Sequence, residues 1–288
     1  MKSILIAIFF PLLTMFVISK SNAGLNPGNI NGAYLGQKPP GLTPEPFAPG
    51  IITTEHYEFS GVFTPDMKEF YLLRKGGKYE SYALVVFKQE NNQWYESIAS
   101  PSLGRPSISP DGKTIHLGKR YLERTKSGLS EVKKLGTLFK DIDVMRLTSS
   151  SKGTYVFDEY GNDGDGVIRY SRLIGGKREL PKPFPKAINS GTWNAHPFIA
   201  PDESYIMWDG RRNEGYGDSD IYISFRKQDG SWGNAINLGD KINTDVWEAS
   251  PSITPDGKYL FFHRMVTPGN IDVFWVSAQV IENLRPKH

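Results

Sequence analysis

Nine aromatic, charged and amide side chains occupy matching places in successive repeats of this sequence. Aromatic rings pack flat against sugar rings and apolar groups, and arginines bind carboxylates through paired hydrogen bonds. A set of this composition on one surface is suited to a glycan or to the end of a peptide. We therefore predict a ligand-binding channel face made of these residues: Tyr57, Glu58, Arg105, Arg146, Trp193, Asn194, His196, Trp247 and Glu248.

A structural role is the alternative for the same residues. Trp193 and Trp247 can instead pack between neighbouring sheets, and this is the interpretation that the sequence favours for them. The two arginines can pair with the two glutamates of the set merely to satisfy their charges, which explains them as well as ligand binding does.

A second candidate site lies in the acidic, glycine-rich stretch 158–171. Its residues Asn162, Asp163 and Asp165 resemble part of an oxygen-ligand calcium loop. If Asp165 begins the Asp-Gly step of such a loop, Arg172 falls where a bidentate glutamate is needed. A polar turn between two strands is therefore the preferred interpretation, and we predict no metal and no cofactor.

Signatures of known catalytic sites are missing from the sequence. It contains no Gly-x-Ser-x-Gly, no His-Glu-x-x-His and no phosphate-binding loop, and its five histidines are scattered. We predict no catalytic residue. One alternative stays open, a lyase or hydrolase of polysaccharide or peptide in which His196 acts together with Glu58 and Glu248.

The repeats themselves are visible as two matching segments. Residues 187–208 (AINSGTWNAHPFIAPDESYIMW) align without a gap on residues 241–262 (KINTDVWEASPSITPDGKYLFF), at an offset of 54 residues. The second half of this unit recurs around Pro65, Pro110 and Ser151. Each copy has an alternating strand, a turn of Pro-Asp-Gly type and another alternating strand, so each is predicted to form a β-hairpin.

Further strands extend these hairpins. A third follows in several copies, as in 220–226 and 272–278, and a fourth, carrying Trp, comes after the segments that run to Trp94 and Trp232. Four strands per repeat are typical of a propeller blade. We predict an all-β propeller of about five four-stranded blades, with six as the alternative. The segment before Thr54 is expected to pair with the C-terminal strands and so to close the ring.

The turn sequences SPDGK at Pro110 and TPDGK at Pro255, each followed by a second strand, resemble those of the TolB-type family of WD40-like β-propeller repeats. The resemblance covers nearly the whole chain after its first 23 residues. It implies a propeller fold. It does not imply one function, because the family includes protein-binding propellers, sugar-active proteins and propellers attached to peptidases.

The N-terminus has the pattern of a secretory signal peptide. Lys2 precedes an uncharged, mostly apolar run, and the small residues Ser21 and Ala23 lie where signal peptidase reads its site. The apolar run is shorter than a membrane-spanning helix. We therefore predict a signal peptide over 1–23 and a single propeller domain over 24–288, without a membrane span after cleavage.

Composition narrows the function further. The chain has no cysteine, which excludes disulfides and thiolate chemistry, and its net charge is only +3, with acids and bases interspersed. A basic face for nucleic acid is therefore not expected. The sequence favours a periplasmic or secreted, non-catalytic binding module for a protein, peptide or glycan. A structural component of an envelope assembly is a further alternative.

Overall fold

The computed structural model of the protein describes residues 30–101, 104–161 and 166–287. The predicted signal peptide lies outside these residues. Helical structure in the described ranges is limited to α1 (Gln279–Glu282) and the 3-10 turns η2 (Ala33–Gly36) and η3 (Thr137–Phe139). None of the described helices has the length and apolar composition needed to cross a bilayer. The predicted all-β class is confirmed.

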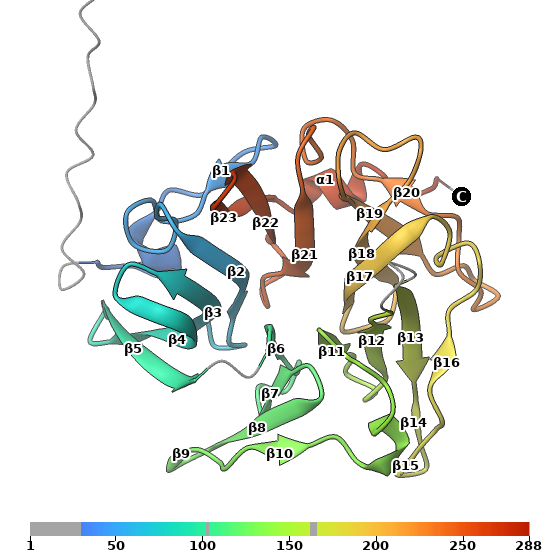
Figure 1. The fold of residues 1–288 in the computed structure, drawn as a ribbon, viewed down its shortest axis with the longest axis horizontal. Coiled ribbons are helices and arrows are strands. Elements are labelled where there is room, and N and C mark those ends of the chain that lie inside the picture. The colour runs from blue at the N-terminus through green and yellow to red at the C-terminus, as the bar shows by residue number, and fades with distance from the viewer. Residues whose placement is uncertain (1–29, 102–103, 162–165, 288) are drawn as a thin grey trace, which may run out of the picture.

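The strands form sets that lie around a central region (Figure 1). One set is β2 (Tyr57–Phe63), β3 (Glu69–Gly76), β4 (Tyr79–Glu90) and β5 (Gln93–Pro101). Another is β6 (Pro106–Ile108), β7 (Thr114–Leu117), β8 (Arg120–Thr125) and β10 (Lys133–Lys134), with β9 (Gly128–Leu129) beside β8. A third is β11 (Leu147–Ser149), β12 (Tyr155–Glu159), β13 (Val167–Ser171) and β16 (Lys182–Pro183).

The remaining strands continue the same arrangement. One set is β17 (Thr192–Ile199), β18 (Tyr205–Arg211), β19 (Asp220–Phe225) and β20 (Ile236–Asn237). The C-terminal set is β21 (Glu248–Ile253), β22 (Tyr259–Thr267) and β23 (Asn270–Ser277). It is continuous with the first set, because β23 pairs with β2 in parallel at Ile271 and Tyr57. A small hairpin of β14 (Leu173–Ile174) and β15 (Lys177–Arg178) stands apart. In every set the first strand lies nearest the centre (Figure 1). These innermost strands are β2, β6, β11, β17 and β21.

Hydrogen bonds explain why the Pro-Asp turns form hairpins. Before the proline, the Thr64 hydroxyl donates to Asp66 Oδ1 at 2.6 Å, and the same oxygen accepts the Lys68 N–H at 3.1 Å. Equivalent bonds recur at Ser109 with Asp111 and at Thr254 with Asp256. The turn is therefore fixed by residues within four positions of the proline, and the hairpins predicted from these turns are present.

The segment before Thr54 pairs with the end of the chain. Strand β1 (Glu45–Pro46) lies antiparallel to β23, and the Phe47 N–H donates to the Val273 carbonyl at 2.8 Å. The Phe47 ring is fully buried, 4.8 Å from the ring of Phe261 and 5.0 Å from that of Trp275. The expected pairing of the two ends of the chain is therefore present.

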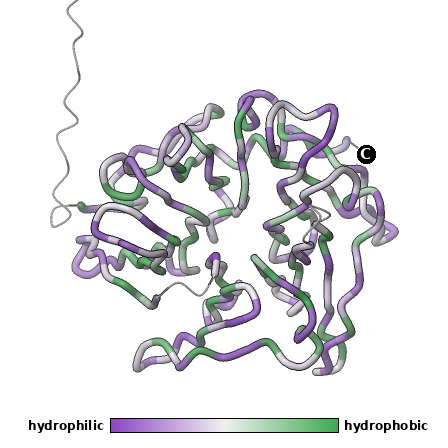
Figure 2. The backbone as a smooth tube through the Cα atoms, viewed as in Figure 1, coloured by the Kyte–Doolittle hydropathy of each residue, from purple (hydrophilic) through white to green (hydrophobic). Residues whose placement is uncertain are grey.

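Hydrophobic residues are spread over all the sets of strands rather than gathered in one centre (Figure 2). They form separate clusters, the largest of which packs β1 to β5 and the N-terminal segment against β22 and β23. Apolar side chains fill the spaces between the sets, whereas the innermost strands carry many of the buried polar side chains. The centre of the molecule is thus where a polar site can form.

Side-chain hydroxyls connect neighbouring sets near the centre. Ser107 on β6 donates to the Leu147 carbonyl of β11, and Thr148 on β11 donates to the Pro197 carbonyl of β17 at 3.2 Å. Ser252 on β21 donates to the Gly61 carbonyl of β2, also at 3.2 Å. The last set along the chain therefore contacts the first, which gives a propeller-like arrangement.

Candidate functional site

Backbone bulges shape the innermost strands where the site lies. Ser60, His196 and Ser250 have left-handed φ angles of 54°, 47° and 56°, and strand pairing shifts register beside each of them. Arg105 and Arg146 take the matching place in the other two sets. Left-handed backbone is costly for residues other than glycine and is often found at functional sites.

Two aspartates hold these positions together. Asp209 Oδ1 accepts the Ser250 N–H at 2.9 Å, and both of its carboxylate oxygens lie 3.0 Å from His196 Nδ1. Asp158, one set earlier, accepts the N–H groups of Arg146 and His196 at 2.9 and 2.8 Å. Each aspartate therefore bridges its own set to the next one, and Asp209 also orients the imidazole of His196.

Arg146 lies fully buried at the centre of the molecule. Its Nη1 donates to the carbonyls of His196 and Pro251 at 3.1 and 2.8 Å, whereas its Nε and Nη2 have no hydrogen-bond partner among the described residues. Burial lowers the pKa of Arg146 to about 10, although the nearby carboxylate of Asp209 acts to raise it. The side chain is still cationic at neutral pH, and the three N–H groups on Nε and Nη2 have no partner among the described residues.

Arg105 is positioned by the glycine before it. Gly104 has a φ of 141°, and a Cβ there would lie 2.7 Å from the backbone of Leu117, so a larger residue would push the chain away. The guanidinium lies 4.6 Å from the ring centre of Phe59, and its buried Nη1 has no partner among the described residues. Burial lowers the pKa of Arg105, while Asp209 and Asp158 act to raise it.

Arg105 also lines a cavity at the start of the innermost strands, which we call the loop-face pocket. Its volume is about 430 Å³. The lining residues are Leu73, Gly104, Arg105, Leu117, Lys119, Arg120, Asp143, Val144, Met145 and Tyr160. The Lys119 ammonium is 2.7 Å from Asp143, and no carboxylate of the described residues lies within ion-pair distance of Arg105 or Arg120. The pocket is therefore cationic with an apolar wall.

His263 completes the centre. Its ring is fully buried, 4.9 Å from the ring of Trp247 and 6.3 Å from that of His196, and neither ring nitrogen has a hydrogen-bond partner among the described residues. Burial, and then the positive charge of Arg105, hold the pKa of His263 well below its usual range. It is therefore a neutral imidazole at physiological pH.

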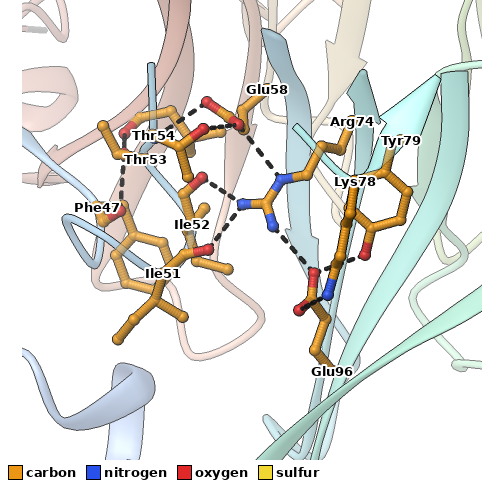
Figure 3. A network of polar contacts seen from close by, with 11 residues as sticks. Phe47, Ile51, Ile52, Thr53, Thr54, Glu58, Arg74, Lys78, Tyr79 and Glu96 are labelled. Atoms are coloured by element: carbon orange, nitrogen blue, oxygen red, sulfur yellow. Dashed lines mark hydrogen bonds and ion pairs between the residues drawn. The ribbon is translucent and has the colours of Figure 1, made fainter. Parts of the chain in front are cut away.

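Glu58 does not point freely into this centre. It is fully buried, its Oε1 lies 3.3 Å from Arg74 Nε, and both the N–H and the hydroxyl of Thr54 donate to it (Figure 3). Arg74 in turn reaches the Ile51 and Ile52 carbonyls and Glu96. This network anchors the N-terminal segment to β3.

Glu248 has the same surroundings in the C-terminal set. Arg264 Nε lies 2.7 Å from its Oε1, and the N–H and hydroxyl of Thr244 donate to it at 2.9 and 2.5 Å. Both glutamates are thus paired with arginines on the second strand of their own set, not with Arg105 or Arg146. Neither glutamate pairs with His196, whose ion-pair partner is Asp209.

The aromatic and amide members of the predicted face have separate surroundings. Trp193 is 43% exposed, whereas Trp247 is half-buried and packs against Phe59 and His263. Tyr57 stacks on Phe59 with ring centres 6.1 Å apart. Asn194 is buried and accepts the Trp208 indole N–H at 3.1 Å. The structure therefore brings together Arg105, Arg146 and His196, and places the others around them or within their own sets.

The weak metal candidates Asn162, Asp163 and Asp165 lie outside the described residues. In the ranges that are described, no group of three or more His, Asp or Glu side chains could hold a metal ion. The prediction of a polar turn there stays a prediction.

Sequence reasoning missed three residues of the centre, namely Asp158, Asp209 and His263. All three lie on the second strand of a hairpin, whereas the candidate site residues were taken from matching positions on or just before the first strand. A signal was available, because Asp209 and His263 follow their Pro-Asp turns at the same spacing and are 54 residues apart, like the repeats themselves.

Comparison with known proteins supports the fold and goes no further. No family model matches the chain, and no curated protein matches it either. Among solved structures, the catalytic domain of an α-L-arabinofuranosidase (GH62) from Coprinopsis cinerea has a TM-score of 0.52 at 8% identity, over 83% of this chain and 97% of that one. At this identity the likeness concerns the fold alone.

Structures of the predicted family are also similar. TolB from Acinetobacter baumannii gives a TM-score of 0.47 at 18% identity, over 76% of this chain and 54% of that one. The chain thus spans about half the length of that TolB. A gluconolactonase, XC5397 from Xanthomonas campestris, gives 0.46 at 9% identity over 78% and 86%. The chain is an all-β protein of propeller-like fold.

Proposed function

We propose that this protein is an exported, non-catalytic binding module with a single five-bladed propeller domain over 24–288. The arrangement of the strands supports five blades, if β1 is counted as the fourth strand of the C-terminal set, with which it pairs. The bond from Ser252 to the Gly61 carbonyl supports a closed ring, since it joins the last set to the first. A rigid ring of this kind lowers the entropy that is lost when a ligand binds.

The observation that carries the binding role is Arg105 in the loop-face pocket. Arg105 is partly buried, and a guanidinium removed from water without an ion-pair partner is costly unless something compensates its charge. Arg105 has a free Nη1, and Arg120 lines the same cavity without an ion pair among the described residues. A bound anion would compensate the charge of Arg105 and add an ion pair with the exposed Arg120.

The ligand proposed for this pocket is an acidic glycan or an acidic peptide. The two arginines would bind its carboxylates, and the ring of Tyr160, which is 42% exposed, offers a stacking surface at the rim. Trp193 belongs to the same end of the innermost strands and extends the candidate face. A protein partner would present the same acidic groups from a surface segment.

The test is a thermal-shift screen of the 24–288 protein against acidic oligosaccharides, their neutral counterparts, and acidic and neutral peptides. A ligand that binds only the folded state raises the melting temperature. We expect a rise with an acidic class, abolished in Arg120→Gln and kept in the matched control Arg172→Gln, whose side chain is exposed and lies in another set. No rise with any acidic class, or a rise that survives Arg120→Gln, would remove this proposal.

Catalysis is the second candidate function, and one observation favours it. His196 Nδ1 is held by Asp209 at 3.0 Å while its buried Nε2 has no partner among the described residues, which is the geometry of an oriented general base. A lyase or hydrolase would release new sugar or peptide ends from a polymer, and His196→Gln would abolish that release. Polymers left intact by the wild-type protein would exclude it.

Export to the periplasm or the medium is proposed from the N-terminal sequence. Cleavage after Ala23 predicts a mature chain that begins at Gly24. Fractionation of cells followed by N-terminal sequencing of the protein tests this directly, because an intact Met1 in the cytoplasmic fraction would contradict it. A structural role in an envelope assembly would appear as stable cross-links to the same neighbour.

A further inference from the structure

A second cavity lies at the opposite end of the innermost strands, and we call it the turn-face funnel. It is surrounded by the Pro-Asp turns of the hairpins, and its volume is about 350 Å³. The rim includes Pro65, Pro201 and Pro255, which are exposed, so the funnel opens at the surface. This volume is within the range of sites for small organic ligands.

Arg146 forms the closed end of the funnel. It is fully buried and lines the cavity, and its Nε and Nη2 have no hydrogen-bond partner among the described residues. No carboxylate in the described ranges lies within ion-pair distance of the Arg146 guanidinium. Of the two nearby aspartates, Asp158 accepts the Arg146 backbone N–H, and Asp209 contacts His196 and Ser250 instead. Two nitrogens of a buried cation, with three N–H groups between them, are therefore left for an anion.

The walls of the funnel offer little competing polarity. Phe198, Ile253 and Val62 contribute apolar surface. The hydroxyls of Ser107 and Thr148 each donate to the carbonyl of a neighbouring strand, so their protons are already used. The funnel thus combines one charged donor at its base with an apolar passage above it.

We propose that the turn-face funnel binds an organic carboxylate with an apolar body, with the carboxylate on Arg146 and the body between the proline turns. A planar guanidinium with free N–H groups on two nitrogens matches a carboxylate, and the apolar walls favour an aromatic or branched chain over a sugar. This site is separate from the loop-face pocket, which has its own cations and opens at the other end of the strands.

The same chemistry has two sources, a free organic acid or the C-terminal carboxylate of a peptide. The probes are therefore 3-phenylpropionate and N-acetyl-Gly-Phe, each compared with its neutral amide by isothermal titration calorimetry. Hydrogen bonds to charged groups are worth enough to make each amide at least about tenfold weaker than its acid. Binding of the peptide acid alone would identify chain ends as the source.

Two substitutions test the site in different ways. Arg146→Gln removes the cation. Phe198→Trp narrows the funnel and leaves Arg146 unchanged. Each is expected to weaken binding of the acid probes at least about tenfold, whereas Arg172→Gln at an exposed arginine should leave it unchanged. If Arg146→Gln fails to fold, Phe198→Trp still decides the question.

The proposal is overturned if neither acid binds, if acid and amide bind equally, or if Phe198→Trp keeps full affinity. Its failure is distinguishable from failure of the proposed function. Arg120→Gln changes the loop-face pocket and should leave binding of the two acid probes unaffected, because Arg120 lines the loop-face pocket and not the turn-face funnel.

Discussion

Two pairs of arginines, each with one buried and one partly buried member, show how the same residue type takes different roles in one fold. Arg74 and Arg264 each lie beside a buried glutamate and reach backbone carbonyls, so their charges are compensated within the protein. Arg105 and Arg146 are as deeply placed but have no ion pair among the described residues, and both line cavities. The difference is consistent with a structural role for the first pair and with the ligand-binding role that we propose for the second.

The largest effect should come from breaking a compensated pair. Arg74→Met leaves Glu58 as an unpaired buried charge and removes donors from the Ile51 and Ile52 carbonyls. We expect a loss of about 3 to 5 kcal/mol in the free energy of unfolding, measured by urea denaturation at pH 7. A loss below about 1 kcal/mol would mean that the pair is not structural.

Removal of an uncompensated arginine should cost much less. Arg146→Met gives up two hydrogen bonds to carbonyls but also removes a buried charge that has no ion pair in the described ranges. We expect a change of about 1 kcal/mol in the same urea experiment, because the two contributions oppose each other. A loss as large as that of Arg74→Met would erase the distinction between the two pairs.

The buried carboxyl group of Asp272 offers a test of the same idea, because its effect on stability should depend on pH. Burial, and then the charge of Glu58, raise the pKa of Asp272 to about 7, and its Oδ1 has no partner among the described residues. Because the folded pKa is higher than the unfolded value near 4, this residue's contribution to stability is full below about pH 4 and is lost as pH rises through about 7.

Asp272→Asn should flatten this decline between about pH 4 and 7, by an amount on the order of 1 kcal/mol after solvent screening. Melting temperature measured against pH for both proteins gives the comparison. Parallel curves for wild type and variant would show that Asp272 does not titrate in this range.

The smallest effect is expected at the exposed edge of the site. Trp193 is 43% exposed, so Trp193→Ala should change the free energy of unfolding by less than about 0.5 kcal/mol. The same variant should weaken ligand capture at the loop face if the indole contacts the ligand. Urea denaturation of wild type and Trp193→Ala measures the effect on stability, and the thermal-shift screen measures the effect on ligand binding. We expect the two proteins to have the same denaturation midpoint.

Local contacts explain which features could be predicted from the sequence. The turn at Thr64 is fixed by Asp66 and Lys68, all close in the chain, and a pattern search finds such turns. The partner of Glu58 is Arg74, which lies opposite it on the next strand. An alignment of repeats compares equivalent positions and does not show which residues face each other across a hairpin. Contacts between sets, such as Asp158 with His196, depend on how the sets are arranged in space.

The pairing of β1 with β23 also constrains how the protein reaches its native state. Phe47 and Trp275 stand at opposite ends of the chain, so the C-terminal set cannot be completed until nearly the whole chain has been made. Contacts this distant in sequence slow folding, since a long loop must close before they form. A chain that folds late remains extended during synthesis, which is the state that a secretion channel accepts, if the protein is exported as proposed.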